Sequence, residues 1–148
     1  MQDFRNLSVW QMARRLTKSI YELTTDFPAS EEFGLKAQMR RASMSICSNI
    51  AEGCGRRGDP EFRRFLGVAM GSACELESET ILSSDLVLIT DAAQQKILAV
   101  LVEIKRMLSG LIKSLAPRKP VPASTMVSVE EVEMKRQRRK ERPTADSS

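Results

Sequence analysis

The sequence predicts an all-α fold, a four-helix bundle whose neighbouring helices run antiparallel in an up-down-up-down order. Apolar residues recur every three or four positions in four successive segments, which is the period of an amphipathic helix. Proline and glycine clusters separate these segments. Aromatic residues make up only 5% of the chain and methionine occurs eight times, so the interior is expected to be aliphatic. A length of 148 residues suits one such domain and a tail.

The first two predicted helices are set by their apolar stripes and by the residues that interrupt them. The first runs from about Ser8 to Asp26, and Pro28 prevents its continuation. The second follows Gly34 and ends near the glycines at positions 53, 55 and 58. The stripe residues are Leu7, Val9, Trp10, Ala13, Leu16, Ile20 and Leu23 in the first helix, and Leu35, Met39, Ala42, Ile46 and Ile50 in the second.

The third and fourth predicted helices both begin at an aspartate. Asp59 is expected to cap the third, because proline at the next position sacrifices no hydrogen bond there, and this helix should reach about Ile89. Asp91 is expected to cap the fourth, whose apolar side ends at Leu115. Connections this short place consecutive helices antiparallel.

A change of composition after the fourth helix predicts two parts, a bundle over residues 1–116 and a tail over 117–148. Prolines at 117, 120 and 122 mark an extended linker. From Arg118 onward the chain has 8 Lys and Arg against 5 Asp and Glu. The segment from Val129 to Arg142 is compatible with a transient helix but has too few apolar residues to bury, so the basic tail is expected to be disordered to Ser148.

Composition argues against several classes of function. The chain has no histidine, the usual general base and transition-metal ligand, so an enzyme, a cofactor and a metal centre are not expected. Glu75 and Glu79 lie one helical turn apart but lack further ligands. Cys47, Cys54 and Cys74 are interpreted as buried, reduced thiols. Without an apolar run of membrane-spanning length or the pattern of a signal peptide, a cytoplasmic location is expected.

Several motifs occur in a specific order. They are Phe4-x-x-Leu7-x-Val9-Trp10, then Phe27-Pro28-x-x-Glu31-x-Phe33-Gly34-Leu35-x-x-Gln38-x-x-Arg41-Ala42, then Ser45-Ile46-Cys47-Ser48-Asn49-Ile50-Ala51-Glu52-Gly53, and finally Ala69-x-Gly71-Ser72-x-x-Glu75-Leu76-Glu77. Together they resemble the 23S rRNA intervening-sequence proteins, a bacterial four-helix-bundle family that includes the accessory variability proteins of retroelements. The resemblance covers residues 3–115 and is closer to the intervening-sequence type.

This resemblance implies a ring-shaped homopentamer of up-down-up-down bundles with a basic surface for nucleic acid. The implied partners are other copies of the chain, RNA or DNA and, in the retroelement branch, a reverse transcriptase or another protein. Membership of a family fixes a fold more firmly than a function.

The polar motif residues are interpreted as structural rather than catalytic. They are Arg41, Asn49, Glu52, Gly53, Gly71, Ser72 and Glu75. Arg41 is expected to pair with Glu52 or Glu75, and Asn49 to bond across to Ser72, because a buried polar group left unpaired costs about 1–3 kcal/mol. Gly71, in the middle of a helix, is expected to allow a neighbouring helix to approach closely.

The basic residues form the candidate nucleic-acid site. They are Arg14, Arg15, Lys18, Arg40, Arg41, Arg56, Arg57, Arg63 and Arg64, with Lys36 nearby in the sequence. Arg56, Arg57, Arg63 and Arg64 flank one turn between helices. Arg14, Lys18 and Arg40 are expected to share one rim of the bundle. The alternative is that these residues only form solvent-exposed faces of the helices and bind nothing. A ring would repeat each cluster around its axis and add weak phosphate contacts together.

The sequence therefore supports two functional hypotheses. The first is a non-enzymatic, oligomeric protein that binds RNA or DNA with little sequence preference through the basic clusters and the tail. The alternative is a protein-interaction scaffold that presents its acidic third helix or its tail. Phe4 and Trp10 either anchor a partner or fill the core or a subunit interface. Val87, Ile89 and Val102 lie off the main stripes and suggest an apolar face for self-association.

Overall fold

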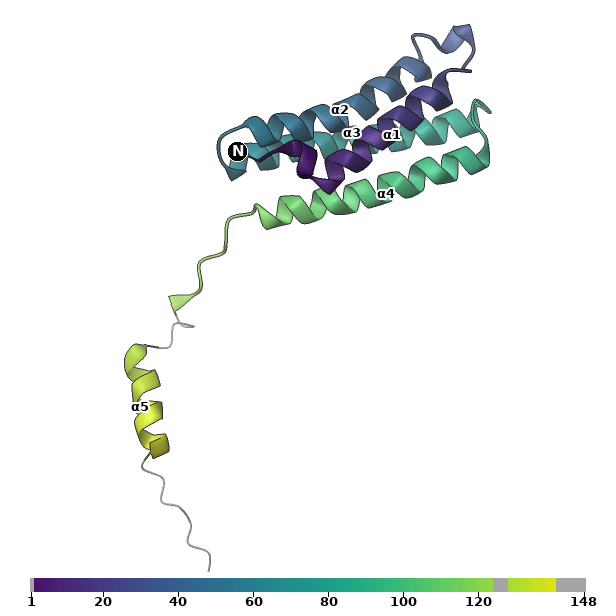
Figure 1. Cartoon of the computed structure of the whole chain (residues 1–148). Helices are drawn as coiled ribbons and strands as arrows, with labels where there is room; N and C mark the ends of the chain where they lie inside the picture. The colour runs from purple at the N-terminus through teal and green to yellow at the C-terminus, as the bar shows by residue number, and fades with distance from the viewer. Residues whose placement is uncertain (1, 124–127, 141–148) are drawn as a thin grey trace, which may run out of the picture. The chain divides into compact units, whose positions relative to one another are not determined.

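The computed structural model describes residues 2–123 and 128–140, and all regular structure within these ranges is helical (Figure 1). The elements are the 3₁₀ turn η1 (Phe4–Asn6), α1 (Ser8–Thr24), the 3₁₀ turn η2 (Ala29–Glu31), α2 (Leu35–Gly55), α3 (Asp59–Asp85), α4 (Asp91–Ser114) and α5 (Val129–Lys140). The chain divides into two compact units between Ala116 and Pro117. Among the described residues, no helix combines the length and the apolar character that a bilayer crossing requires.

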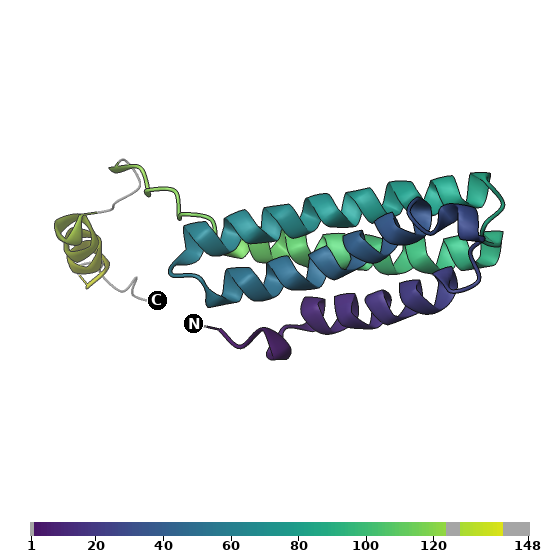
Figure 2. The same ribbon diagram turned by 90° about the horizontal axis from the view of Figure 1, so that it is seen from above.

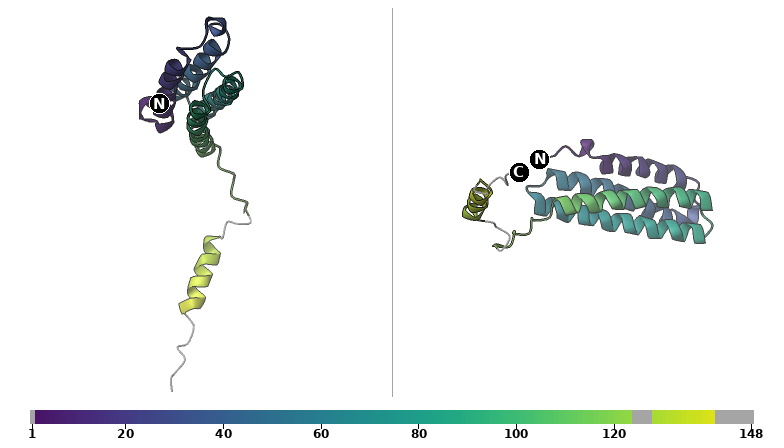
Figure 3. Two further views of the ribbon diagram at one scale, coloured as in Figure 1. Left: turned by 90° about the vertical axis from the view of Figure 1, so that its right-hand side faces the viewer. Right: turned by 90° about the horizontal axis from the view of Figure 1, so that it is seen from below.

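Helices α1 to α4 lie side by side as a bundle (Figures 2 and 3). The contact between α2 and α3 is the most extensive, and that between α1 and α4 is the smallest among the helix pairs of the bundle that touch. Hydrogen bonds connect successive helices: Thr17 Oγ1 donates to Ser43 O at 3.1 Å, Arg41 to Glu75 at 2.7 Å, and Lys105 to Glu77.

The core is aliphatic, as the apolar stripes predict. The largest apolar side chains with no exposed surface are Ile20, Met39, Ile46, Ile50, Leu66, Leu76, Leu101, Ile104 and Leu108. They come from all four helices, so each stripe is buried against the others. Phe4 and Trp10 pack on the edge of this core and are only partly buried.

Three predicted helix ends are wrong, for local reasons. Asp59 does not cap α3: it is the first helical residue, and the cap position belongs to Gly58, whose positive φ of 81° favours glycine. Asp91 likewise follows the cap of α4, where Thr90 Oγ1 accepts from Ala93 N at 3.1 Å. Helix α3 ends at Asp85 rather than near Ile89, because Val87 adopts a left-handed φ of 59°.

The predictions for Gly71 and Cys74 are also wrong. A methyl group added at Gly71 would meet no atom within 4 Å, so this glycine faces open space within the subunit. Cys74 is exposed, whereas Cys54 is buried and Cys47 is half-buried. Burial raises the pKa of the Cys47 and Cys54 thiols, which keeps both protonated at neutral pH.

The tail contains a helix where disorder was expected. None of the residues of α5 is buried, so its helical form does not depend on a core. Ser128 Oγ accepts from Glu131 N at 3.2 Å and caps its start. Acidic residues occupy its first turn and Arg138, Arg139 and Lys140 its last, an order that complements the helix dipole. The disorder predicted for residues 141–148 lies outside the described residues and stays a prediction.

Candidate nucleic-acid interface

Most of the predicted basic residues gather at one end of the bundle. Here α1 begins, α2 ends and α3 begins, and Figure 2 shows the N-terminus at the same end as the turn from α2 to α3. Gln2, Gly53, Phe62 and Leu115 line one shared pocket, so the N-terminal segment, the end of α2, the start of α3 and the end of α4 meet here. The basic residues of α1 line a separate groove.

A groove along α1 is the most basic feature of this end. It is lined by Arg5, Trp10, Gln11, Arg14, Arg15 and Lys18 and has a volume of about 490 Å³. Positions 11, 14, 15 and 18 follow the three- and four-residue spacing that aligns side chains on one face of a helix. No acidic residue lines this α1 groove. Arg5 is paired with Asp3 at 3.1 Å, so the positive charge that the groove offers comes from Arg14, Arg15 and Lys18.

The ring of Trp10 lines the α1 groove and packs against the ring of Phe4. The rings of Phe4 and Trp10 meet edge to face, with centroids 4.9 Å apart and an interplanar angle of 62°. Arg5 lies over the Phe4 ring and Arg14 over the Trp10 ring, with guanidinium-to-centroid distances of 5.5 and 5.7 Å. Trp10 thus packs against the core, one of the roles expected from the sequence, and also lines the groove.

Ion pairs divide the predicted cations into two groups. Within the described part of the chain, Arg14, Arg15 and Lys18 form no ion pair with a carboxylate. Three other predicted cations are paired: Arg41 with Glu75 at 2.7 Å, Arg56 with Glu52 at 2.5 Å and Arg64 with Glu61 at 3.2 Å. Pairing cancels much of their charge at a distance, so the attraction for an anion is strongest at the α1 groove.

The α2–α3 turn adds a second, weaker cluster. Phe65 lies beneath two guanidinium groups, Arg56 at 5.2 Å and Arg64 at 4.3 Å from the ring centroid. The Arg64 guanidinium lowers the pKa of Glu61. Arg57 forms no ion pair within the described residues, and Arg63 has a buried Nε without a hydrogen-bond partner there. This turn therefore contributes Arg57 most directly to a basic surface.

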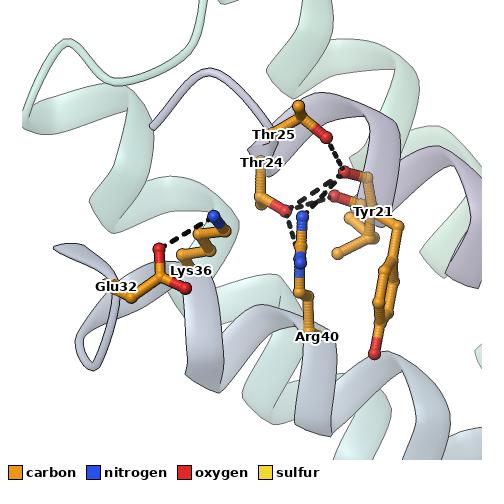
Figure 4. A network of polar contacts seen from close by, with 7 residues as sticks. Tyr21, Thr24, Thr25, Glu32, Lys36 and Arg40 are labelled. Carbon is orange, nitrogen blue, oxygen red and sulfur yellow. Dashed lines mark hydrogen bonds and ion pairs between the residues drawn. The ribbon is translucent and has the colours of Figure 1, made fainter. Parts of the chain in front are cut away.

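Arg40 has a structural role at the other end of α1 (Figure 4). Its Nε donates to Thr24 Oγ1 at 2.9 Å and its Nη2 to the Tyr21 carbonyl at 3.1 Å, with the guanidinium 4.4 Å from the Tyr21 ring centroid. A cation bound to the last carbonyls of a helix favours that helix end. Arg40 does not line the groove that Arg14 and Lys18 share. Lys36 forms an ion pair with Glu32 at 2.9 Å.

The polar motif residues join α2 to α3, as expected, but through different partners. The ion pair between Arg41 and Glu75 is confirmed, although both side chains are exposed. The direct bond from Asn49 to Ser72 is wrong: Asn49 Nδ2 donates to Ser45 Oγ at 3.0 Å, and Ser45 Oγ lies 2.7 Å from Ser72 Oγ. Ser45 is thus the residue in the middle that the sequence analysis missed.

Gly53 has the close contact that was expected at Gly71. A methyl group at Gly53 would lie 2.8 Å from Phe62 Cδ2 and 3.0 Å from Phe65 Cβ. These two rings follow the α2–α3 turn directly. Gly53 therefore allows α3 to cross closely over the end of α2 and so fixes the position of the turn.

Glu79 is the one strongly shifted acid of the described structure. Its side chain is only 8% exposed, and Oε2 has no hydrogen-bond partner within the described residues. Burial and the neighbouring Glu75 raise its pKa to about 7, against the opposing effect of Arg41. In the described part of the chain, no three Asp, Glu or Cys side chains are grouped as metal ligands. Glu79 is a protonation site on the α2 side of α3.

Comparison with known proteins agrees with this architecture. The family model described as 23S rRNA-intervening sequence protein matches residues 5–110. The chain belongs to this family. A similar solved structure comes from Bacteroides thetaiotaomicron and is described as a protein with unknown function from the S23 ribosomal protein family. It is 25% identical, covers 71% of this chain and 98% of its own, and has a TM-score of 0.65.

No curated protein matches the chain. The region shared with the 23S rRNA-intervening sequence protein family includes α1, α2 and α3 and most of α4, and it therefore includes the α1 groove. Helix α5 lies outside it. Arg14, Arg15 and Lys18 of the groove were predicted from the sequence, whereas Arg5 and Gln11 were not. The helical spacing of Gln11 from Arg14 and Lys18 is the signal that places Gln11 on the same face.

Proposed function

We propose that this 23S rRNA-intervening sequence protein is a non-enzymatic, oligomeric nucleic-acid-binding protein whose principal contact surface is the α1 groove. The observation that carries the proposal is the group of exposed cations, Arg14, Arg15 and Lys18, without a carboxylate partner in the described residues. Phosphate is the ligand that such a group suits best. The rRNA in the family's description is in keeping with this ligand.

Binding of this kind is largely independent of sequence. Lysine and arginine contacts to phosphates release counterions and fix the position of the nucleic acid without reading base edges. Arg57 on the α2–α3 turn extends the basic surface at the same end. The basic last turn of α5 supplies a further attachment through the linker, because it carries Arg138, Arg139 and Lys140.

Self-association is part of the same proposal. The up-down-up-down, antiparallel order is supported by contacts in which residue numbers rise on one helix and fall on the next, as in Ser45 with Ser72 and Gly53 with Phe62. The assembly we propose is the ring-shaped homopentamer that the resemblance implies, and exposed small and apolar residues on one face of α3 support self-association. These are Gly67, Val68, Gly71, Ile81 and Leu82, together with Val102 on α4.

In a head-to-tail contact, two different surfaces of each copy meet. The apolar face of α3 supplies one of these surfaces, and the α1 groove stays exposed. Contacts between two different surfaces generate rings when the rotation closes. A ring would present several α1 clusters to one nucleic acid and raise its avidity.

A protein-interaction scaffold is the second candidate function. The observation that favours it is again apolar exposure: Val87 is 86% exposed and Phe33 93% exposed, at the α3–α4 turn and before α2. Side chains of this size suit a protein partner better than a phosphate backbone. Nucleic-acid binding would then be incidental.

The test compares two variants of equal charge in the full-length protein. Arg14→Gln/Lys18→Gln removes two groove charges. Lys105→Gln/Arg106→Gln removes one lysine and one arginine of α4, which are paired with Glu77 of α3 and Glu103 of α4. Binding of a fluorescent structured RNA at low salt should weaken in the first variant and stay near wild type in the second. Equal affinity in all three proteins, or no binding at all, would overturn the proposal and favour the scaffold.

A further inference from the structure

We infer that the α1 groove receives an unpaired nucleotide whose base stacks on the indole ring of Trp10, so that the protein selects single-stranded over duplex nucleic acid. This inference rests on the proposed function and deepens it, because it adds a specific contact to a surface otherwise described by charge alone. Its basis is the presence of an aromatic ring in the same groove as the unpaired cations.

The groove combines the groups that bind a nucleotide. Trp10 supplies a π surface, and its indole N–H donates no hydrogen bond within the described residues. Gln11 donates its amide to Arg5 O at 2.8 Å, which leaves its side-chain carbonyl free to accept from a base. A stacking ring beside hydrogen-bonding groups and cations is the arrangement by which proteins hold single strands.

The cations continue along the helix from the ring. Arg14 and Lys18 follow Trp10 by four and eight residues, on the same face of α1. Each step of four residues advances about 6 Å along the helix axis. A strand whose base rests on Trp10 therefore has positive charge beside its backbone as it leaves along α1.

The indole ring is already held in place. Phe4 contacts it edge to face, with ring centroids 4.9 Å apart, and the core lies behind both rings. A ring fixed before binding loses little freedom when a base stacks on it. Arg14, whose guanidinium lies 5.7 Å from the ring centroid, is exposed and can move from the indole to a phosphate.

A duplex cannot make the same contact. Its bases already stack on one another, and placing one on Trp10 requires that base to be unpaired and turned out, which costs energy. Duplex nucleic acid therefore meets only the cations of the groove. The base contact is what separates the two ligand classes.

The experiment uses the intrinsic fluorescence of Trp10, which is the only tryptophan of the chain. Full-length protein is titrated at low salt with a short oligouridylate, an oligothymidylate and an abasic oligonucleotide, all of equal length and charge, and with a duplex that has the same number of phosphates. Both base-containing single strands should quench the fluorescence and bind roughly tenfold more tightly than the abasic strand. The first two ligands also show whether the groove distinguishes ribose from deoxyribose.

A variant and a matched control complete the test. Trp10→Leu should lose about tenfold in affinity for single strands while its affinity for the abasic strand and the duplex is unchanged. Tyr21→Leu removes another aromatic ring that packs against an arginine but lies outside the groove. This variant should bind single strands with wild-type affinity. Thermal unfolding of both variants tests whether they fold. The quenching measurement on the wild-type protein needs neither variant.

The outcomes separate this inference from the proposed function. Equal affinity for abasic and base-containing strands, without quenching, overturns base stacking but leaves phosphate binding intact. Absence of binding by every ligand at low salt overturns both. Quenching by the single strands with the expected loss in Trp10→Leu supports both.

Discussion

Gly53 lies directly beneath the ring of Phe62, so close that a methyl group at Gly53 would approach Phe62 Cδ2 to 2.8 Å. The same methyl group would meet the Phe62 carbonyl oxygen at 3.3 Å. Both neighbours belong to the first turns of α3, which is also the part of the chain that carries Arg63 and Arg64. The absence of a side chain at Gly53 thus determines how closely α3 packs on α2 beside the basic surface.

Gly53→Ala should therefore destabilise the protein. Overpacking of a rigid contact costs about 1–3 kcal/mol, which exceeds the gain of about 1 kcal/mol in helix propensity. Urea unfolding measures the difference. Gly110→Ala is the control, because a methyl group there meets no atom within 4 Å, and it should stabilise the protein by about 0.5–1 kcal/mol. A Gly53→Ala protein as stable as the control would contradict the close contact.

Val87→Gly should stabilise the protein. Val87 is exposed and adopts a φ of 59°, a conformation that is costly for a β-branched residue and free for glycine. Relief of this strain should raise the free energy of unfolding by about 1 kcal/mol, even after the greater flexibility of glycine in the unfolded chain. Leu86→Gly, at a φ of −84°, gains nothing and should destabilise. If both variants lose stability equally, strain at Val87 is not the reason why α3 ends at Asp85.

Sequence periodicity was sufficient for the core and insufficient for the helix ends. Stripes such as Leu16, Ile20 and Leu101, Ile104 identify buried positions because helical spacing and burial are directly linked. The cap of α4 was assigned to Asp91 rather than Thr90, since either residue suits that position and only the backbone path decides between them. Close packing was predicted at Gly71 and occurs instead at Gly53, because it depends on which helix face has a neighbour.

The candidate site was predictable in outline only. Sequence restricts the partner of Arg41 to Glu52 or Glu75, but the choice of Glu75, 34 positions away, is decided only in the folded chain. Arg40 appears equivalent to Arg14 in sequence, yet one holds the end of α1 and the other lines the groove. A helix in the tail was predicted only as a transient state, because the segment has few apolar residues to bury, whereas capping and the order of charges also stabilise a helix.

Stability should decrease between about pH 5 and pH 8 because of Glu79. Its pKa is raised to about 7 in the folded protein, so the protonated form favours folding. This contribution is complete below the ordinary glutamate pKa near 4.5 and is lost as the pH rises through 7. The loss is on the order of 2–3 kcal/mol.

Glu79→Gln isolates this effect. Its free energy of unfolding should vary less between pH 5 and pH 8 than that of wild type, and it should be the more stable protein at pH 8. Glu22→Gln, at an exposed position on α1, should retain the wild-type dependence. Parallel pH profiles for wild type and Glu79→Gln would show that Glu79 ionises without cost in the folded chain.

Arg40→Gln should lower stability without weakening nucleic-acid binding. The substitution removes the hydrogen bonds to buried Thr24 and to the Tyr21 carbonyl, a loss of about 1–3 kcal/mol. Thermal unfolding and RNA binding are measured on the same preparation. Arg57→Gln is the converse control, with little change in stability and weaker binding. If Arg40→Gln and Arg14→Gln lower the RNA affinity equally, Arg40 is part of the nucleic-acid-binding surface and the prediction is wrong.

The dependence of RNA affinity on salt tests the central claim most directly. For full-length protein, the logarithm of the association constant should fall linearly with the logarithm of salt concentration, and the slope should become less steep by about 1–2 in Arg14→Gln/Lys18→Gln because two phosphate contacts are lost. The paired-charge variant Lys105→Gln/Arg106→Gln should keep the wild-type slope. The account is contradicted if wild-type affinity is independent of salt, or if the two double variants reduce the slope to the same extent.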